Sequence, residues 1–159
     1  MRIEVVSRLP ANTDRVWRRI TTTDGINHEL APWLTMTPPA GQGLSIEKAR
    51  VGEPLGRWVI RLFGVLPVEY DLLMLRRVDP GIGFHEDSTM LTMRRWQHLR
   101  TVYPEPDGRA RLVDVVIAEP RRALIPARPL LRLLLTALFR HRHRRIADYL
   151  GNEPSAVAG

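Results

Sequence analysis

Turn signals recur along the middle of this chain, and no other feature constrains its fold as strongly. From residue 44 to residue 120, short runs rich in strand-forming residues are separated by clusters of Gly, Pro and Asp at 52–54, 64–67, 79–81 and 104–108. Punctuation of this kind predicts an antiparallel meander. We expect strands at 45–51, 56–63, 68–78, 82–89, 92–103 and 110–119.

A single long helical pattern follows the predicted meander. Its apolar residues recur at helical spacing over roughly 123–150, with Pro126 and Pro129 near the first turn and Gly151 placed to end the helix. An antiparallel sheet can bury one face against such a helix and leave its other face in solvent. The pattern therefore predicts an α+β fold.

The N-terminal part adds one strand and two short helices. Residues 3–9 alternate between apolar and polar up to a proline, which indicates a strand. Asn12 or Thr13 can cap a first helix, and Asp24 can cap a second. The second helix is expected to carry Ile26, Leu30, Trp33 and Leu34.

Composition agrees with one globular domain. The chain has 159 residues, 44% of them hydrophobic, which favours one domain over 1–151 with a flexible tail at 152–159. The absence of cysteine excludes a disulfide framework and a thiolate nucleophile. The most apolar stretch, 124–139, is interrupted by two arginines and is shorter than the ~20 residues of a membrane helix. No export signal is visible at the N-terminus, so we expect a cytoplasmic protein.

The order of predicted elements resembles that of the START-like superfamily, which includes bacterial polyketide cyclase/dehydrase-like proteins. Three stretches carry the resemblance: ANTDRVW at 11–17, FHEDS at 84–88, and WQHLR at 96–100 followed by Asp107-Gly108 and Asp114. The resemblance spans about residues 2–150. It implies a helix-grip fold, in which a curved antiparallel sheet of six to seven strands wraps around the long C-terminal helix and encloses a cavity. It does not choose between a carrier and an enzyme.

Polar residues on the last two predicted strands form the candidate catalytic group. A hairpin centred near residue 106 sets His98 opposite Asp114, whereas a shift of two residues would set Arg100 opposite Asp114. In either register Trp96, His98, Arg100 and Asp114 share one face of the sheet, because side chains alternate with period two. The prediction of a shared face therefore does not depend on the register.

Two interpretations of that face remain open. If it lines a cavity, His98 paired with Asp114 can act as a general acid–base, Arg100 can neutralise a carboxylate or enolate, and Glu86 can add a polar contact. Alternatively, the cluster satisfies its own hydrogen bonds and holds the strands in register.

Large apolar side chains offer a soft lining for a hydrophobic ligand, although ordinary core packing explains them equally well. The candidate ligand-binding residues are Trp33, Met36, Trp58, Tyr70, Phe84, Ser88, Trp96 and Val116.

The formal net charge of +7 comes almost entirely from arginine, and its densest run is 140–145. Such a run complements the helix dipole on a solvated face, or it contacts an anionic membrane surface. A nucleic-acid partner is not expected, because no known nucleic-acid module is present. His28-Glu29 and His85-Glu86 match no metal motif, and no nucleotide fingerprint occurs, so we expect neither metal nor cofactor.

Three functions therefore remain open at the level of sequence. The first is a carrier of a lipid, a polyketide or another hydrophobic small molecule. The second is a polyketide cyclase or dehydratase that uses His98. The third is an interaction module that uses the basic helix, and the chain is expected to be a monomer or a homodimer.

Overall fold

The computed structural model describes residues 1–39, 45–46 and 49–152. These residues form seven strands, two short helices, a 3₁₀ segment and one long helix. In chain order the elements are β1 (Arg2–Leu9), α1 (Thr13–Ile20), α2 (Thr23–Leu30), β2 (Leu34–Thr37), β3 (Pro54–Leu62), β4 (Leu66–Asp79), β5 (Gly83–Met90), β6 (Met93–Pro104), β7 (Ala110–Pro120), the 3₁₀ segment Arg122–Ala127 and α3 (Arg128–Asn152).

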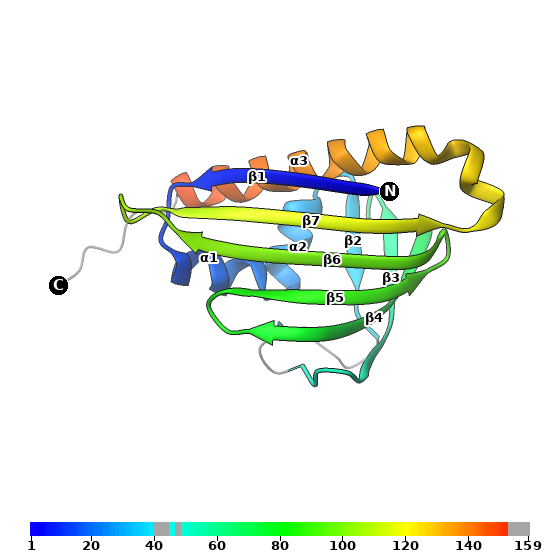
Figure 1. Ribbon diagram of the computed structural model, residues 1–159, viewed down its shortest axis with the longest axis horizontal. Helices are drawn as coiled ribbons and strands as arrows, with labels where there is room; N and C mark the ends of the chain where they lie inside the picture. The colour runs from blue at the N-terminus through cyan, green and yellow to red at the C-terminus, as the bar shows by residue number, and fades with distance from the viewer. Residues whose placement is uncertain (40–44, 47–48, 153–159) are drawn as a thin grey trace.

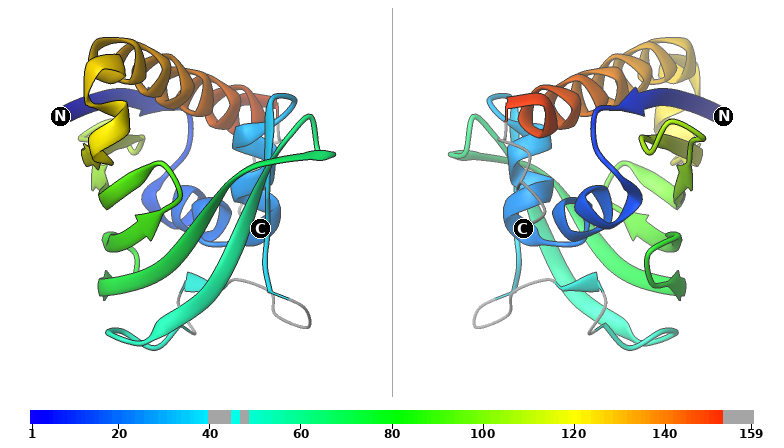
Figure 2. Two further views of the ribbon diagram at one scale, coloured as in Figure 1. Left: turned by 90° about the vertical axis from the view of Figure 1, so that its right-hand side faces the viewer. Right: turned by 90° about the vertical axis from the view of Figure 1, so that its left-hand side faces the viewer.

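All seven strands belong to one antiparallel sheet, in the order β1-β7-β6-β5-β4-β3-β2 (Figure 1). The sheet curls into a half-barrel, and α3 lies across its open side (Figure 2). The helices α1 and α2 lie beneath α3 inside the curl. The predicted helix-grip fold is thereby confirmed.

One strand was assigned to the wrong segment. The described part of 45–51 contains no strand: Ser45 makes only an isolated bridge to Thr22, and residues 47–48 lie outside the described residues. The seventh strand is instead β2, formed by residues predicted to end the second helix. Pro32 explains the difference, because a residue that precedes proline is pushed out of the helical region. Ala31 accordingly has extended backbone angles and ends α2.

The two short helices have side-chain caps. Asn12 caps α1 as predicted, since the backbone N–H of Arg15 donates to Asn12 Oδ1 at 3.0 Å. The cap of α2 is Thr22, not Asp24: the N–H of Gly25 donates to Thr22 Oγ1 at 3.1 Å. Asp24 lies in the first turn of α2, where its charge still complements the helix dipole.

The long helix begins later and ends later than predicted. Pro126 lies in the 3₁₀ segment before it, Pro129 lies in its first turn, and Gly151 lies inside its last turn. Among the described residues, no helix is both long enough and apolar enough to cross a membrane. The predicted tail was 152–159; Asn152 is the last residue of α3, and 153–159 lie outside the described residues.

The hairpin between β6 and β7 sets the register of the candidate catalytic face. Its strands pair His98 with Val116 and Arg100 with Asp114, so the first predicted register is wrong by two residues and the shifted one is correct. The turn is centred at Asp107 because Gly108 adopts a positive φ of 79°, a conformation that glycine accepts without strain.

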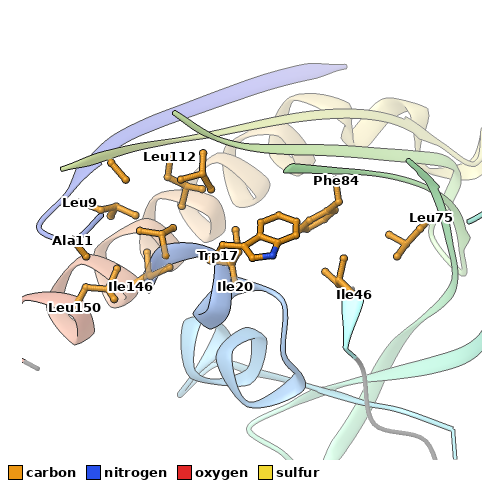
Figure 3. Packing of buried hydrophobic residues seen from close by; sticks show 13 residues of the cluster. Leu9, Ala11, Trp17, Ile20, Ile46, Leu75, Phe84, Leu112, Ile146 and Leu150 are labelled. Atoms are coloured by element: carbon orange, nitrogen blue, oxygen red, sulfur yellow. The ribbon is translucent and has the colours of Figure 1, made fainter. Parts of the chain in front are cut away.

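Two groups of buried apolar side chains hold the layers together. The first joins α1, β7 and α3 through residues such as Trp17, Leu112 and Ile146 (Figure 3). The second packs the middle of α3 against the sheet through Phe139 and Trp96. Both groups contribute walls to an internal cavity.

Candidate functional site

A cavity of about 230 Å³ lies between the curled sheet and α3. Most of its wall is apolar and comes from α2, the inner face of β2 to β6, and α3. The volume is close to the lower end of the ~300–1,000 Å³ typical of small-molecule sites. The arrangement suits a small hydrophobic molecule.

Five predicted site residues line this cavity: Met36, Phe84, Glu86, Trp96 and His98. Trp96 and His98 line the cavity from β6, a direction that the sequence left open, and both are buried. The inward direction of the shared face is therefore seen in the structure. The functional roles of these residues remain predictions.

The other predicted ligand contacts do not line the cavity. Trp33 is 51% exposed and packs against the ring of Phe63, because it follows α2 instead of lying within it. Tyr70 stacks under Arg57, whose Cζ lies 4.3 Å from the ring centroid. Trp58, Ser88 and Val116 are buried in the surrounding core.

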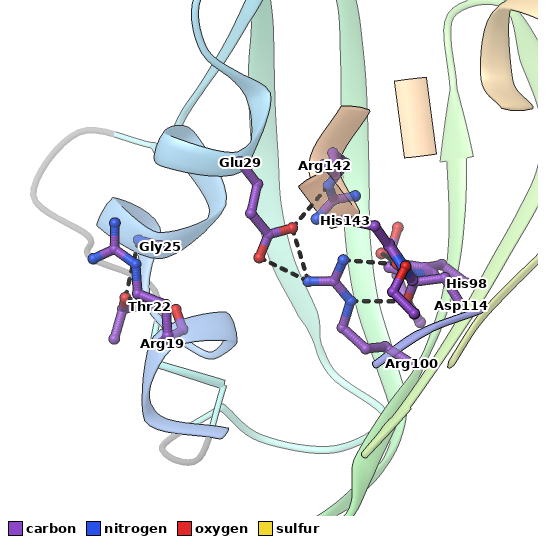
Figure 4. A network of polar contacts seen from close by, with 11 residues as sticks. Arg19, Thr22, Gly25, Glu29, His98, Arg100, Asp114, Arg142 and His143 are labelled. Atoms are coloured by element: carbon purple, nitrogen blue, oxygen red, sulfur yellow. Dashed lines mark hydrogen bonds and ion pairs between the residues drawn. The ribbon is translucent and has the colours of Figure 1, made fainter. Parts of the chain in front are cut away.

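Arg100 and Asp114 are fully buried and are not among the residues that line the cavity. Asp114 accepts four hydrogen bonds (Figure 4): His98 Nε2 and Arg100 Nε donate to its Oδ1 at 3.0 and 2.8 Å, and Arg100 Nη2 and His143 Nε2 donate to its Oδ2 at 2.7 and 3.0 Å. A carboxylate has about four acceptor positions. Asp114 therefore has no free acceptor position for a ligand.

Two further buried charges complete this network. Arg100 Nη1 donates to both carboxylate oxygens of Glu29 at 2.9 Å, and Arg142 Nε donates to Glu29 Oε2 at 3.0 Å. We call Glu29, His98, Arg100, Asp114, Arg142 and His143 the buried ionic network. It joins α2, β6, β7 and α3.

The network shifts the proton equilibria of its members. Burial alone would raise the pKa of Asp114, but the charges of Arg100 and His98 hold it well below its usual range. Burial alone would lower the pKa of His98, yet the adjacent Asp114 carboxylate raises it. Because an ionised carboxylate only accepts, His98 Nε2 carries a proton.

The basic run at 140–145 does not form one solvated face. Arg142 and His143 are buried in the network, whereas Arg140 and Arg144 are exposed. Helical spacing gave a usable signal for this: Arg142 and His143 follow the buried Phe139 by three and four residues and precede the buried Ile146. The interpretation of the whole run as a solvated face is therefore wrong for its central pair.

A pair of carboxyl groups lines the cavity. Asp71 on β4 lies within hydrogen-bonding reach of Glu86 and Ser88 on β5, and Ser88 Oγ donates to Glu86 Oε1 at 3.0 Å. Burial and then the charge of Glu86 raise the pKa of Asp71 well above its usual range. We call Asp71 and Glu86 the carboxyl pair. Asp71 was not among the predicted site residues, although it alternates with Leu73 and Leu75 on the buried face of β4.

Replacing Asp71 with asparagine is expected to make stability less dependent on pH. The pKa of Asp71 is higher in the folded protein than in the unfolded chain, where it is 3.8. Wild-type stability therefore declines as the pH rises from 3.8 to the pKa of the folded state. The variant lacks this ionisation, so its stability relative to wild type should rise by up to about 1.4 kcal/mol per pH unit in that window. Urea denaturation at a series of pH values measures the difference.

The control for this experiment is Asp79→Asn, at the exposed end of the same strand, where the carboxylate pairs with Arg77. A difference between wild type and Asp71→Asn that stays constant from pH 4 to pH 8 would show that the Asp71 pKa is not raised.

Among the described residues, no group of three His, Asp or Glu side chains is arranged to hold a metal ion. His28 and Glu29, which are adjacent in sequence, diverge in the structure. Glu29 binds the buried arginines, and the ring of His28 packs against Tyr149 with centroids 5.1 Å apart.

Comparison with known proteins identifies relatives of this fold. The sequence model of a family described as "Domain of unknown function (DUF8410)" matches residues 7–150. None of the curated proteins matches the chain by sequence.

Several solved structures are similar along nearly the whole chain. Protein CV1439 from Chromobacterium violaceum is 17% identical, with a TM-score of 0.70 over 96% of this chain and 99% of that one. A START superfamily protein from Mycobacterium smegmatis is 6% identical, with a TM-score of 0.67 over 94% and 97%. DynU16, described as a protein in the dynemicin biosynthetic locus, is 17% identical, with a TM-score of 0.60 over 95% of this chain and 47% of that one. These structures share the fold described above.

Proposed function

The chain belongs to the family described as "Domain of unknown function (DUF8410)" and has the START-like helix-grip fold, and from this premise we propose that it binds a hydrophobic small molecule, such as a lipid or a polyketide-like compound. The ligand would occupy the cavity between the sheet and α3. The observation that carries the proposal is the mostly apolar cavity wall, which does not include Arg100 or Asp114. Burial of apolar ligand surface supplies the affinity in such a site.

The partners of the His98 ring nitrogens favour binding without catalysis. A general acid–base needs a ring nitrogen within reach of the substrate. His98 Nε2 donates to Asp114 at 3.0 Å, and His98 Nδ1 lies 3.6 Å from Glu86 Oε2. Both nitrogens thus face carboxyl groups of the protein, which supports a carrier over an enzyme.

A cyclase or dehydratase remains the second candidate, because the His98 ring itself contributes to the cavity wall. The similarity to DynU16, from a biosynthetic locus, points the same way. The interaction module has less support, since the centre of the basic run is buried. A cytoplasmic location and a monomeric or dimeric state remain predictions from the sequence.

Native mass spectrometry of the purified protein tests the first two candidates together. A carrier should retain an apolar compound both in wild type and in His98→Gln, a variant that keeps a donor toward Asp114. A converted compound that appears only when His98 is present would favour the enzyme. Circular dichroism of both proteins checks that the fold is intact.

Filling the cavity should weaken the binding of a neutral apolar dye such as Nile red. Leu135 contributes to the wall from α3, so Leu135→Trp places added side-chain volume inside the cavity and should weaken dye binding at least about tenfold, or ~1.4 kcal/mol. Fluorescence titration measures the change.

The matched control is Leu134→Trp, one residue earlier on the same helix, where the side chain is 56% exposed. This variant should bind the dye as wild type does. Equal affinities for Leu135→Trp and wild type would place the dye outside the cavity and contradict the proposal.

A further inference from the structure

We propose that the carboxyl pair recognises an amine, so that the preferred ligand is a small apolar molecule with a protonated amino group. The inference rests on the proposed function, because it assigns a ligand class to the same cavity. It depends on how Asp71 and Glu86 are placed and on which of their oxygen atoms have partners.

Asp71 is a buried acid that lines the cavity and has one unpartnered oxygen atom. Its side chain belongs to the wall, and the residue is 2% exposed. Within the described part of the chain, its Oδ1 has no hydrogen-bond partner. A buried acceptor without a donor is unfavourable. A ligand that brings an N–H or O–H group to this atom would remove that cost.

Glu86 provides the second carboxyl group of the recognition site. It also lines the cavity, and it lies directly opposite His98 in the sheet register. Ser88 Oγ donates to its Oε1, and His98 Nδ1 lies 3.6 Å from its Oε2, so both sides of this carboxyl group are held in place. An ammonium group has three donors and can therefore contact Asp71 and Glu86 together.

The other charged groups that face the cavity already have partners. Glu69 accepts from the backbone N–H groups of Leu91 and Thr92 at 2.6 and 3.1 Å. Arg142 binds Glu29, and His98 binds Asp114. The carboxyl pair is thus the polar feature of the wall that retains an open acceptor in the described residues.

Charge favours an amine over other head groups. A carboxylic acid would bring a further negative charge beside two carboxyl groups, which repel it. A ketone offers only an acceptor to the open Oδ1. An alcohol can donate one hydrogen bond but brings no charge, so it should bind less tightly than an amine of the same shape.

Binding of an ammonium group should release a proton. Burial and then the charge of Glu86 raise the pKa of Asp71, so this carboxyl group keeps its proton to higher pH than an ordinary aspartic acid does. The arriving ammonium charge replaces that proton, which passes to the solvent, and no covalent bond is made or broken. Proton release therefore reports contact with the carboxyl pair specifically.

Isothermal titration calorimetry with three ligands of one shape tests the proposal: 4-phenylbutylamine, 4-phenylbutanol and 4-phenylbutyric acid. In wild type at pH 7 the amine should bind about tenfold more tightly than the alcohol, and the acid should bind most weakly. Repeating the amine titration in phosphate and in Tris, which differ in ionisation enthalpy, at a series of pH values from about 4 to 8 should show proton release at the pH values where free Asp71 is protonated.

Asp71→Asn and Glu86→Gln are the diagnostic variants. Both should lose the preference for the amine over the alcohol and the proton release, and circular dichroism checks that each is folded. If wild type binds the amine no better than the alcohol, or without proton release, the inference is wrong. Nile red separates the two proposals: a wild-type protein that binds neither the dye nor the ligands contradicts the proposed function itself.

Discussion

Replacing Arg100 with alanine is expected to destabilise the folded protein by about 3–5 kcal/mol. Arg100 is fully buried, and its guanidinium group donates to Asp114 and to Glu29. Its removal leaves two carboxylates out of water without their main counter-charge. Because small domains are stable by only about 5–15 kcal/mol, the loss should bring the protein close to unfolding at room temperature.

Urea denaturation measures this effect, with Arg94→Ala as the matched control. Arg94 is on the same strand and pairs with Glu119, but its side chain is 73% exposed, so its replacement should cost at most about 1 kcal/mol. Arg100→Met, which restores volume but not charge, separates packing from electrostatics. If Arg100→Ala costs no more than Arg94→Ala, the buried charges do not depend on Arg100.

Replacing Phe139 with alanine should cost about 3–5 kcal/mol. Phe139 is 1% exposed and lies in the middle of α3, where its ring meets the His98 ring edge-on at a centroid distance of 5.1 Å. It also borders the cavity, so its removal should enlarge that space. Thermal or urea denaturation gives the loss of stability.

Leu133→Ala provides the comparison for Phe139→Ala on the same helix. Leu133 is 66% exposed, and its truncation should change stability by no more than about 0.5 kcal/mol. Similar effects for the two variants would mean that the middle of α3 does not pack against the sheet. A milder variant, Phe139→Leu, should fall between them.

Local patterns were sufficient to predict much of this fold. Alternation and turn residues located five of the six strands expected between 45 and 119, and period two brought Trp96, His98, Arg100 and Asp114 to one face. The errors arose where one residue changes the geometry: Pro32 ended α2 early, and Gly108 moved the centre of the hairpin.

The sequence could not predict which of the candidate catalytic residues line the cavity and which do not. His98, Arg100 and Asp114 share a face, yet His98 lines the cavity while the other two do not. The division depends on Glu29 and on His143, which approach from helices far away along the chain. Which charges meet across such distances is decided by tertiary packing, and no local pattern encodes it.

The buried ionic network also constrains the order in which the molecule can be assembled. Arg142 and Glu29 are 113 residues apart in sequence, His143 and Ser7 are 136 apart, and β1 pairs with β7. A chain emerging from the ribosome must therefore hold Glu29 and Asp114 in solvent until α3 has been made. Closure of such long loops slows folding, so the sheet and its charges become a native interior only after α3 has been synthesised.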